Sequence, residues 1–175
     1  SRPAAPPHGP ALPPPEVISR INGYRRGNGL YEYAHKATLM RIAQAQADYM
    51  ASTSVVTHSG PDGSRPIDRA YAANYGEGHK IFVSEIIYGG YQSTVDTAIT
   101  WWKNSSLHND QMLAQTYVEI GAGVATNGDS TYYVADMGWV TSLAAPEDSG
   151  GSTSGDSASG SSDSTGDGTT VEAAA

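Results

Sequence analysis

The hydrophobic residues of this chain change their spacing along the sequence, and this change constrains the fold more than any other feature. In the first two thirds, apolar residues recur at intervals of three and four, as they do on one face of a helix. In the last third they alternate with small or polar residues, a pattern typical of strands. Helices followed by antiparallel strands indicate an α+β domain.

The helical spacing predicts four helices, each bounded by residues that start or stop helices. The expected segments are one from Pro15 to Gly27 or Gly29, one through 39–50, a short one at 67–73, and one that begins at Ser93 or Thr94. Asp96 is placed to cap the last of these. Trp101 and Trp102 are adjacent in that helix, so we expect Trp102 to be buried and Trp101 to be partly exposed.

The alternating spacing predicts a hairpin near the end of the domain. Its strands are 117–124 and 131–140, and the turn signal Asn127-Gly128-Asp129 lies between them. A further strand near 82–87 would carry Glu85.

Regular structure is expected only between two low-complexity ends. Residues 1–15 contain seven prolines and are predicted to form an extended, proline-rich arm. Residues 147–175 are rich in Ser, Gly and Asp without any aromatic residue, so we interpret them as an acidic tail or linker. The remaining residues 16–146 are predicted to be a single domain with one hydrophobic core.

Charge and composition narrow the function classes. The net charge is −8 and no basic residue follows Lys103, so the chain lacks the basic face that a nucleic-acid partner requires. No apolar run is long enough to predict a membrane span. The absence of cysteine excludes a disulfide framework and thiolate chemistry.

The two ends also suggest a location. Proline-rich and Ser/Thr-rich segments are typical of surface spacers and of glycosylated stretches, so we expect an extracellular or cell-surface protein whose signal peptide has been removed. A cytoplasmic domain with similar ends remains an alternative.

Three polar segments supply the candidate site. One spacing, W-x-x-S-x-x-H, joins Trp102, Ser105 and His108, while His58 and Glu85 lie in two earlier segments. Two histidines and a glutamate from separated segments indicate a polar cleft. The other histidines, His8, His35 and His79, are predicted to be solvated.

These residues resemble the CAP superfamily of cysteine-rich secretory proteins, antigen five and pathogenesis-related proteins. Further matches follow in family order: Asn22-x-x-Arg25, Gly29-Leu30, Asp68-Arg69-Ala70 and Glu119-Ile120-Gly121-Ala122-Gly123. The resemblance covers roughly residues 16–142, and the lack of cysteine favours the bacterial SCP-like branch. It implies a three-layer α–β–α sandwich with a small antiparallel sheet.

The resemblance also implies the roles of the site residues. The two family histidines map onto His58 and His108, and the first family glutamate maps onto Glu85. Ser105 stands where eukaryotic members have a second glutamate, so the family quartet is incomplete. The predicted ligand-binding residues are therefore His58, Glu85, Ser105 and His108, with His58 and His108 as ligands of zinc or another divalent cation.

Three functions remain open at this point. The first is a non-catalytic cleft that binds a metal, a small molecule, a lipid or a peptide. The second is a structural or adhesive subunit of an extracellular assembly, in which the arm and tail act as connectors through self-assembly or a protein partner. The third is a hydrolase that uses Ser105 or Ser106. No G-x-S-x-G elbow or oxyanion-hole segment is present, so we assign no catalytic residue.

Overall fold

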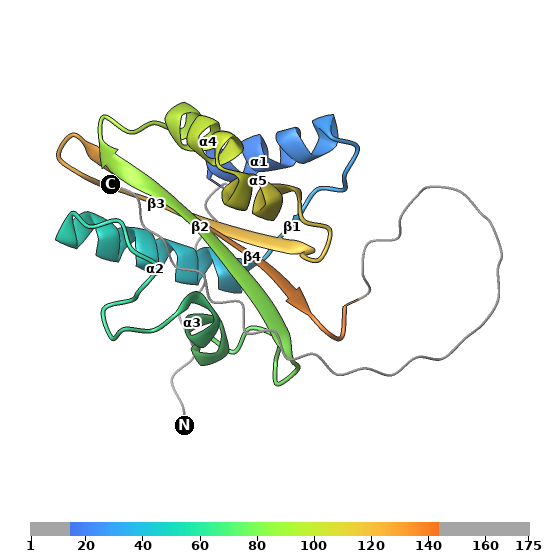
Figure 1. Cartoon of the computed structure of the whole chain (residues 1–175). Coiled ribbons are helices and arrows are strands. Elements are labelled where there is room, and N and C mark those ends of the chain that lie inside the picture. The colour runs from blue at the N-terminus through green and yellow to red at the C-terminus, as the bar shows by residue number, and fades with distance from the viewer. Residues whose placement is uncertain (1–14, 144–175) are drawn as a thin grey trace, which may run out of the picture.

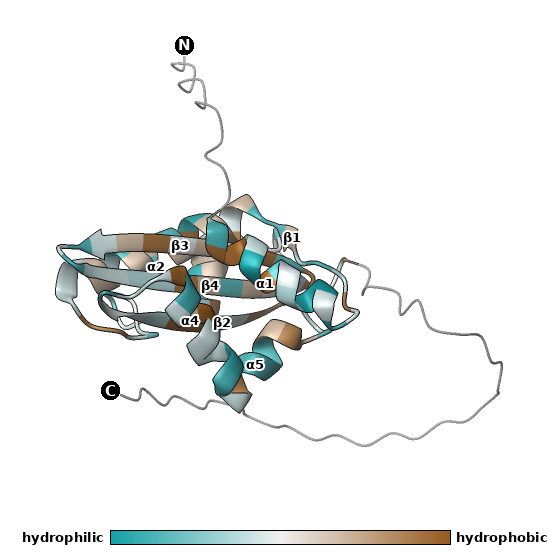
Figure 2. Cartoon of the chain, turned by 90° about the horizontal axis from the view of Figure 1, so that it is seen from above, coloured by the Kyte–Doolittle hydropathy of each residue, from teal (hydrophilic) through white to brown (hydrophobic). Residues whose placement is uncertain are grey.

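Residues 15–143 are described by a computed structural model, in which a sheet lies between two layers of helices (Figure 1). The elements in chain order are α1 (Glu16–Gly27), β1 (Ala34–His35), α2 (Ala37–Thr53), α3 (Pro66–Ala72), β2 (Ile81–Tyr91), α4 (Val95–Asn104), α5 (Ser106–Leu113), β3 (Glu119–Asn127) and β4 (Ser130–Val140). Helices α2 and α3 cover one face, and α1, α4 and α5 cover the other (Figures 1 and 2). The predicted α–β–α sandwich is confirmed. The predicted acidic tail and, apart from Pro15, the predicted arm lie outside the described residues.

The four predicted helices are present, and two details differ. Ser105 has an extended backbone (φ −98°, ψ 116°), so the chain after α4 turns into a separate helix, α5. The prediction that Asp96 caps α4 is wrong. Thr94 is the N-cap, and its hydroxyl accepts a hydrogen bond from the Thr97 N–H at 3.2 Å, while Asp96 pairs with Arg20.

The sheet has the strand order β1-β3-β4-β2. The three long strands are antiparallel, and β3 and β4 form the predicted hairpin, in which Gly128 takes a left-handed conformation (φ 57°). Strand β1 adds two residues in parallel to β3, which makes the sheet mixed. Two residues are too few to show an alternating pattern, so nothing in the sequence predicted β1.

Helix α2 lies directly on β3 because that strand has glycine where the helix crosses it. A Cβ atom on Gly121 would lie 2.1 Å from backbone atoms of Leu39 and Met40, and one on Gly123 would lie 2.4 Å from the Ala43 carbonyl oxygen. Gln44 completes the contact, since its side chain bonds both the N–H and the C=O of Val124. At these two positions no side chain fits between the helix and the strand.

The opposite face of the sheet holds the larger apolar cluster. It is built mainly from α1, α4, α5 and the strand residues beneath them, among which are Val17, Ile18, Ile21, Ile86, Ala98, Ile99, Trp102, Met112, Ile120 and Met137. Trp102 is fully buried, and its indole N–H donates to the carbonyl of Ile87 at 3.0 Å. Because this carbonyl is not paired with β4, the bond fixes α4 against the outer edge of β2.

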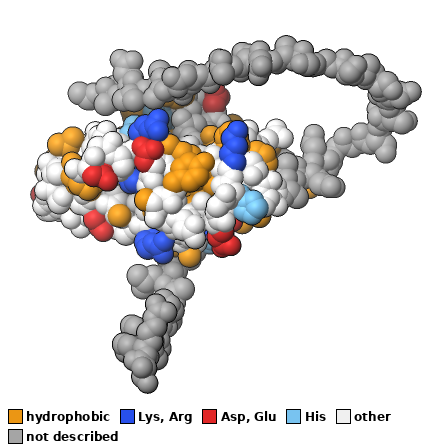
Figure 3. Space-filling view, turned by 90° about the horizontal axis from the view of Figure 1, so that it is seen from below, with side chains coloured by type: hydrophobic (Ala, Val, Ile, Leu, Met, Phe, Trp, Pro, Cys, Tyr) orange, Lys and Arg blue, Asp and Glu red, His pale blue; other side chains and the backbone are white. Residues whose placement is uncertain are grey.

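The surface carries both charged and hydrophobic side chains. On the face shown in Figure 3, Lys and Arg side chains are interspersed with Asp and Glu, and hydrophobic side chains gather near the centre. None of the helices within residues 15–143 has the length and apolar character that crossing a membrane requires.

Candidate functional site

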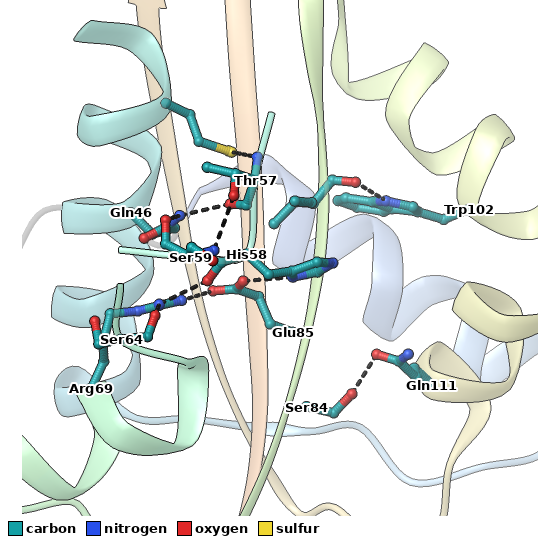
Figure 4. Close-up of polar contacts among 12 residues, drawn as sticks. Gln46, Thr57, His58, Ser59, Ser64, Arg69, Ser84, Glu85, Trp102 and Gln111 are labelled. Carbon is teal, nitrogen blue, oxygen red and sulfur yellow. Dashed lines mark hydrogen bonds and ion pairs between the residues drawn. The ribbon is translucent and has the colours of Figure 1, made fainter. Parts of the chain in front are cut away.

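His58 lies in the loop between α2 and α3, and two side chains hold the backbone of this loop. Gln46 of α2 donates to the carbonyls of Thr57 (2.7 Å) and Ser59 (3.2 Å). Arg69 of α3 donates to the carbonyl of His58 at 2.9 Å. Three successive carbonyls are therefore bound from two helices, which fixes the position of the His58 side chain (Figure 4).

Glu85 of β2 fixes the orientation of that side chain. Its carboxylate is 1% exposed and accepts hydrogen bonds from Arg69 Nη2 at 2.6 Å and from His58 Nδ1 at 2.8 Å. A carboxylate only accepts, so the proton of neutral His58 lies on Nδ1 and the Nε2 lone pair is left free. Figure 4 shows Glu85 between Arg69 and the imidazole, which points toward the side of β2 where Trp102 lies.

His108 of α5 is fixed by different partners. Its Nδ1 lies 2.7 Å from the hydroxyl of Ser105, and its ring meets the edge of Trp101 at a centroid distance of 4.7 Å. Within residues 15–143, no hydrogen bond occupies Nε2 of either His58 or His108. Both rings are therefore anchored through Nδ1.

The two histidines approach each other around the outer edge of β2. Successive β2 residues face opposite helical layers, because Ser84 bonds Gln111 of α5 whereas Glu85 bonds Arg69 of α3. Burial lowers the pKa of His108, and the charge of nearby His58 lowers it further. The structure thus brings His58, Glu85, Ser105 and His108 to one edge of the sheet; their binding role stays a prediction.

Sequence reasoning missed the residues beneath this edge. Asp136 of β4 lies directly across from Glu85, is fully buried, and has no hydrogen-bond partner for either oxygen among the described residues. Burial raises the pKa of Asp136 well above its ordinary value, and the neighbouring Glu85 charge raises it further. An acid inside the apolar run 134–137 was a usable signal for Asp136. Arg69 belongs to one of the family matches, but the sequence alone assigns it no role at the site.

The site offers few donor atoms to a metal ion. Across residues 15–143 there is no group of three or more His, Cys, Asp or Glu side chains that could hold a metal ion. The two imidazoles alone are suitable nitrogen ligands, so water or a ligand would have to fill the other positions of a cation.

Hydrolase chemistry gains no support from the geometry. A serine triad needs an acid that orients the histidine beside the serine. Ser105 is bonded to His108, but Glu85 is bonded to His58. The acid and the hydroxyl therefore serve different histidines.

Comparison with known proteins identifies the relatives of this fold. Residues 18–141 match the family described as CAP, the cysteine-rich secretory protein family. No individually curated protein matches the chain.

Solved structures show the same fold. An outer surface protein from Borrelia burgdorferi aligns with a TM-score of 0.64 and 20% identity, over 72% of this chain and 91% of that one. An extracellular protein containing a SCP domain from Bacillus anthracis aligns with a TM-score of 0.60 and 20% identity, over 70% of this chain and 38% of that one. A structure of NaASP2 with Zn²⁺ aligns more weakly, with a TM-score of 0.44 and 15% identity, over 70% of this chain and 76% of that one.

Proposed function

The chain belongs to the CAP family, and from this premise we propose that its domain is a non-catalytic binding module in which the residues at the β2 edge bind a divalent cation and, through it, a ligand. The supporting observation is the matched anchoring of His58 and His108. Each ring has Nδ1 engaged, by Glu85 or by Ser105, and each leaves Nε2 free among the described residues.

This arrangement is the one that metal-binding histidines usually have. A hydrogen bond to the second ring nitrogen fixes the tautomer and orientation of the ligand, and a carboxylate partner also makes the imidazole more basic. His58 and His108 would hold the cation, while Glu85 and Ser105 would orient the two rings. A bound Zn²⁺ would supply an electrophilic centre for oxygen or anionic groups of the ligand.

The electrostatics of the cleft favour this role. Its lowered pKa keeps His108 neutral at pH values where an ordinary histidine is partly protonated, so its lone pair stays available. Arg69 is bonded to Glu85 and does not compete for the imidazole nitrogens. Two protein ligands leave the cation open, which suits ligand exchange better than permanent metal storage.

We place this activity outside the cell or at its surface. The Bacillus relative is an extracellular protein and the Borrelia relative is an outer surface protein. These relatives share the fold with this chain, and their locations support the same proposal for it.

Calorimetric titration of the full chain with zinc chloride tests the proposal. We expect a binding signal that His58→Ala and His108→Ala each abolish. The matched control is the double variant His35→Ala/His79→Ala, which removes two exposed histidines from other segments and should leave the signal intact. Equal binding by the wild type and the two cleft variants would refute the metal site.

A second variant tests whether Glu85 orients the His58 ring without itself binding the metal. Glu85→Gln keeps the size of the side chain but removes its charge, so the affinity for zinc should fall by about 10–100-fold without being lost. Circular dichroism of each variant establishes that the domain is folded. An affinity unchanged by Glu85→Gln would show that Glu85 does not orient the metal ligand.

A further inference from the structure

A groove beside His108 has a lining that the proposed metal site does not use. It lies between β2 and α4, has a volume of about 330 Å³, and is lined by Tyr88, Asp96, Thr97, Thr100, Trp101 and Asn104. The Tyr88 and Trp101 rings lie 5.8 Å apart at 43°, and Trp101 is 39% exposed. The groove has an aromatic wall and a polar rim.

The rim offers hydrogen-bond donors that the described residues leave unused. The indole N–H of Trp101, the hydroxyl of Thr100 and the amide of Asn104 make no hydrogen bond within residues 15–143. Aromatic rings next to free donors match one kind of backbone particularly well. A polyproline II segment has proline rings that pack against aromatic side chains, and its carbonyls have no internal partners.

The sequence of the chain predicts such a segment before α1. Residues 3–15 include Pro7, Pro10 and Pro13 at intervals of three. Because polyproline II has three residues per turn, these three prolines would share one edge of the helix.

The attachment point of this segment is close to the groove. Pro15 directly precedes α1, and Arg20 of α1 bonds both Glu16, the first residue of that helix, and Asp96 at the end of the groove. From Asp96 to Asn104 the groove follows α4 for about 12 Å. That length matches about four polyproline II residues at about 3.1 Å each.

We propose that the groove between Tyr88 and Trp101 is the docking site of the chain's own proline-rich segment, residues 3–14. Since the groove has room for about four residues of the segment, two successive prolines of the row Pro7, Pro10 and Pro13 lie on the aromatic wall, and the free rim donors bind the neighbouring carbonyls. Docking places the segment beside His108, whose ring contacts Trp101. The inference does not depend on metal binding.

Nuclear magnetic resonance of the indole N–H groups tests it on the full chain. The Trp101 signal, assigned with Trp101→Phe, should shift in the triple variant Pro7→Ala/Pro10→Ala/Pro13→Ala. The matched control Pro3→Ala/Pro6→Ala removes two prolines from a different edge of the segment and should shift it much less. The indole of buried Trp102 reports whether the domain fold is unchanged.

A peptide of residues 1–15 with the natural sequence provides the second arm of the test. Added to the triple variant, it should move the Trp101 signal toward the wild-type position, whereas the peptide with the three substitutions should not. An identical Trp101 signal in the wild type and the triple variant would overturn the proposal. A wild-type signal that changes with protein concentration would also overturn it, in favour of docking between two copies of the chain.

Discussion

The contact between α2 and β3 and the outer edge of β2 are both tightly determined, but by different physical terms. At Gly121 and Gly123 the helix backbone touches the strand, so no atom can be added. At the β2 edge, Glu85 is buried between one guanidinium and one imidazole, so no charge can be removed without leaving another unpaired. Substitutions in the first region are limited by the space available to added atoms, and substitutions in the second region by the need to keep buried charges paired.

The two regions therefore contribute differently to stability. Close packing against glycine leaves no group exposed for chemistry, and its value lies in holding the layers together. The charged edge stabilises the fold less efficiently, because burying ions costs free energy that their attraction only partly returns. The buried Glu85 carboxylate nevertheless holds the partly exposed His58 side chain in a fixed orientation. Three substitutions test this comparison, in order of decreasing effect.

Arg69→Met should have the largest effect. Methionine keeps much of the apolar stem but leaves the Glu85 carboxylate buried without its cation, and the carbonyls of His58 and Ser64 lose a donor. Removing one partner of a buried ion pair costs about 3–5 kcal/mol, and urea unfolding monitored by circular dichroism measures this loss.

The double variant Arg69→Met/Glu85→Gln is the control for charge. If the loss comes from an unpaired carboxylate, the neutral amide should recover part of the free energy of unfolding. If the double variant is no more stable than Arg69→Met, Arg69 stabilises the fold by packing and not by pairing with the Glu85 charge.

Gly121→Ala should have the next largest effect. Its methyl group would lie 2.1 Å from the α2 backbone, so the helix must move, with an expected cost of about 3 kcal/mol. Thermal unfolding measures the change. Gly27→Ala at the end of α1 is the matched control, because nothing lies within 4 Å of its added Cβ and stability should be kept or slightly increased. Equal effects at both glycines would contradict the volume limit.

Asp136→Asn should have the smallest effect, and its sign should depend on pH. The raised pKa of Asp136 means that its stability contribution is present below the unfolded-state pKa, near 3.8, and is lost as pH rises through the folded-state pKa. Asparagine does not titrate, so the variant should gain stability relative to the wild type as pH increases. Free energies of unfolding between pH 4 and pH 8 measure this difference. A difference independent of pH would show that Asp136 is already ionised in the folded protein.

The sequence predicted the elements that have a long hydrophobic repeat. Helices α1 and α2 bury residues at regular helical intervals, as their spacing indicated. In contrast, α5 buries only His108 and Met112, so it has no apolar stripe that separates it from α4. Strand β1 is two residues long and depends entirely on β3 for its pairing.

The site was predictable only in part, for a related reason. His58, Glu85 and His108 were found because the family resemblance supplied their order. The side chains that support them, Gln46 and Arg69, act across contacts that no local pattern encodes. Ser105 occupies the position of the second family glutamate and was predicted to bind ligand, and in the structure its hydroxyl is bonded to the His108 ring.

The bond between Trp102 and the Ile87 carbonyl has a consequence for how molecules of this protein meet. Strand β2 is eleven residues long and lies at an edge of the sheet, where an unpaired strand can recruit a strand from a neighbouring molecule. The indole occupies one acceptor that such a recruit would need, near the middle of the edge. A single tryptophan therefore fixes α4 and also interrupts the row of free backbone groups that a strand from a neighbouring molecule would need.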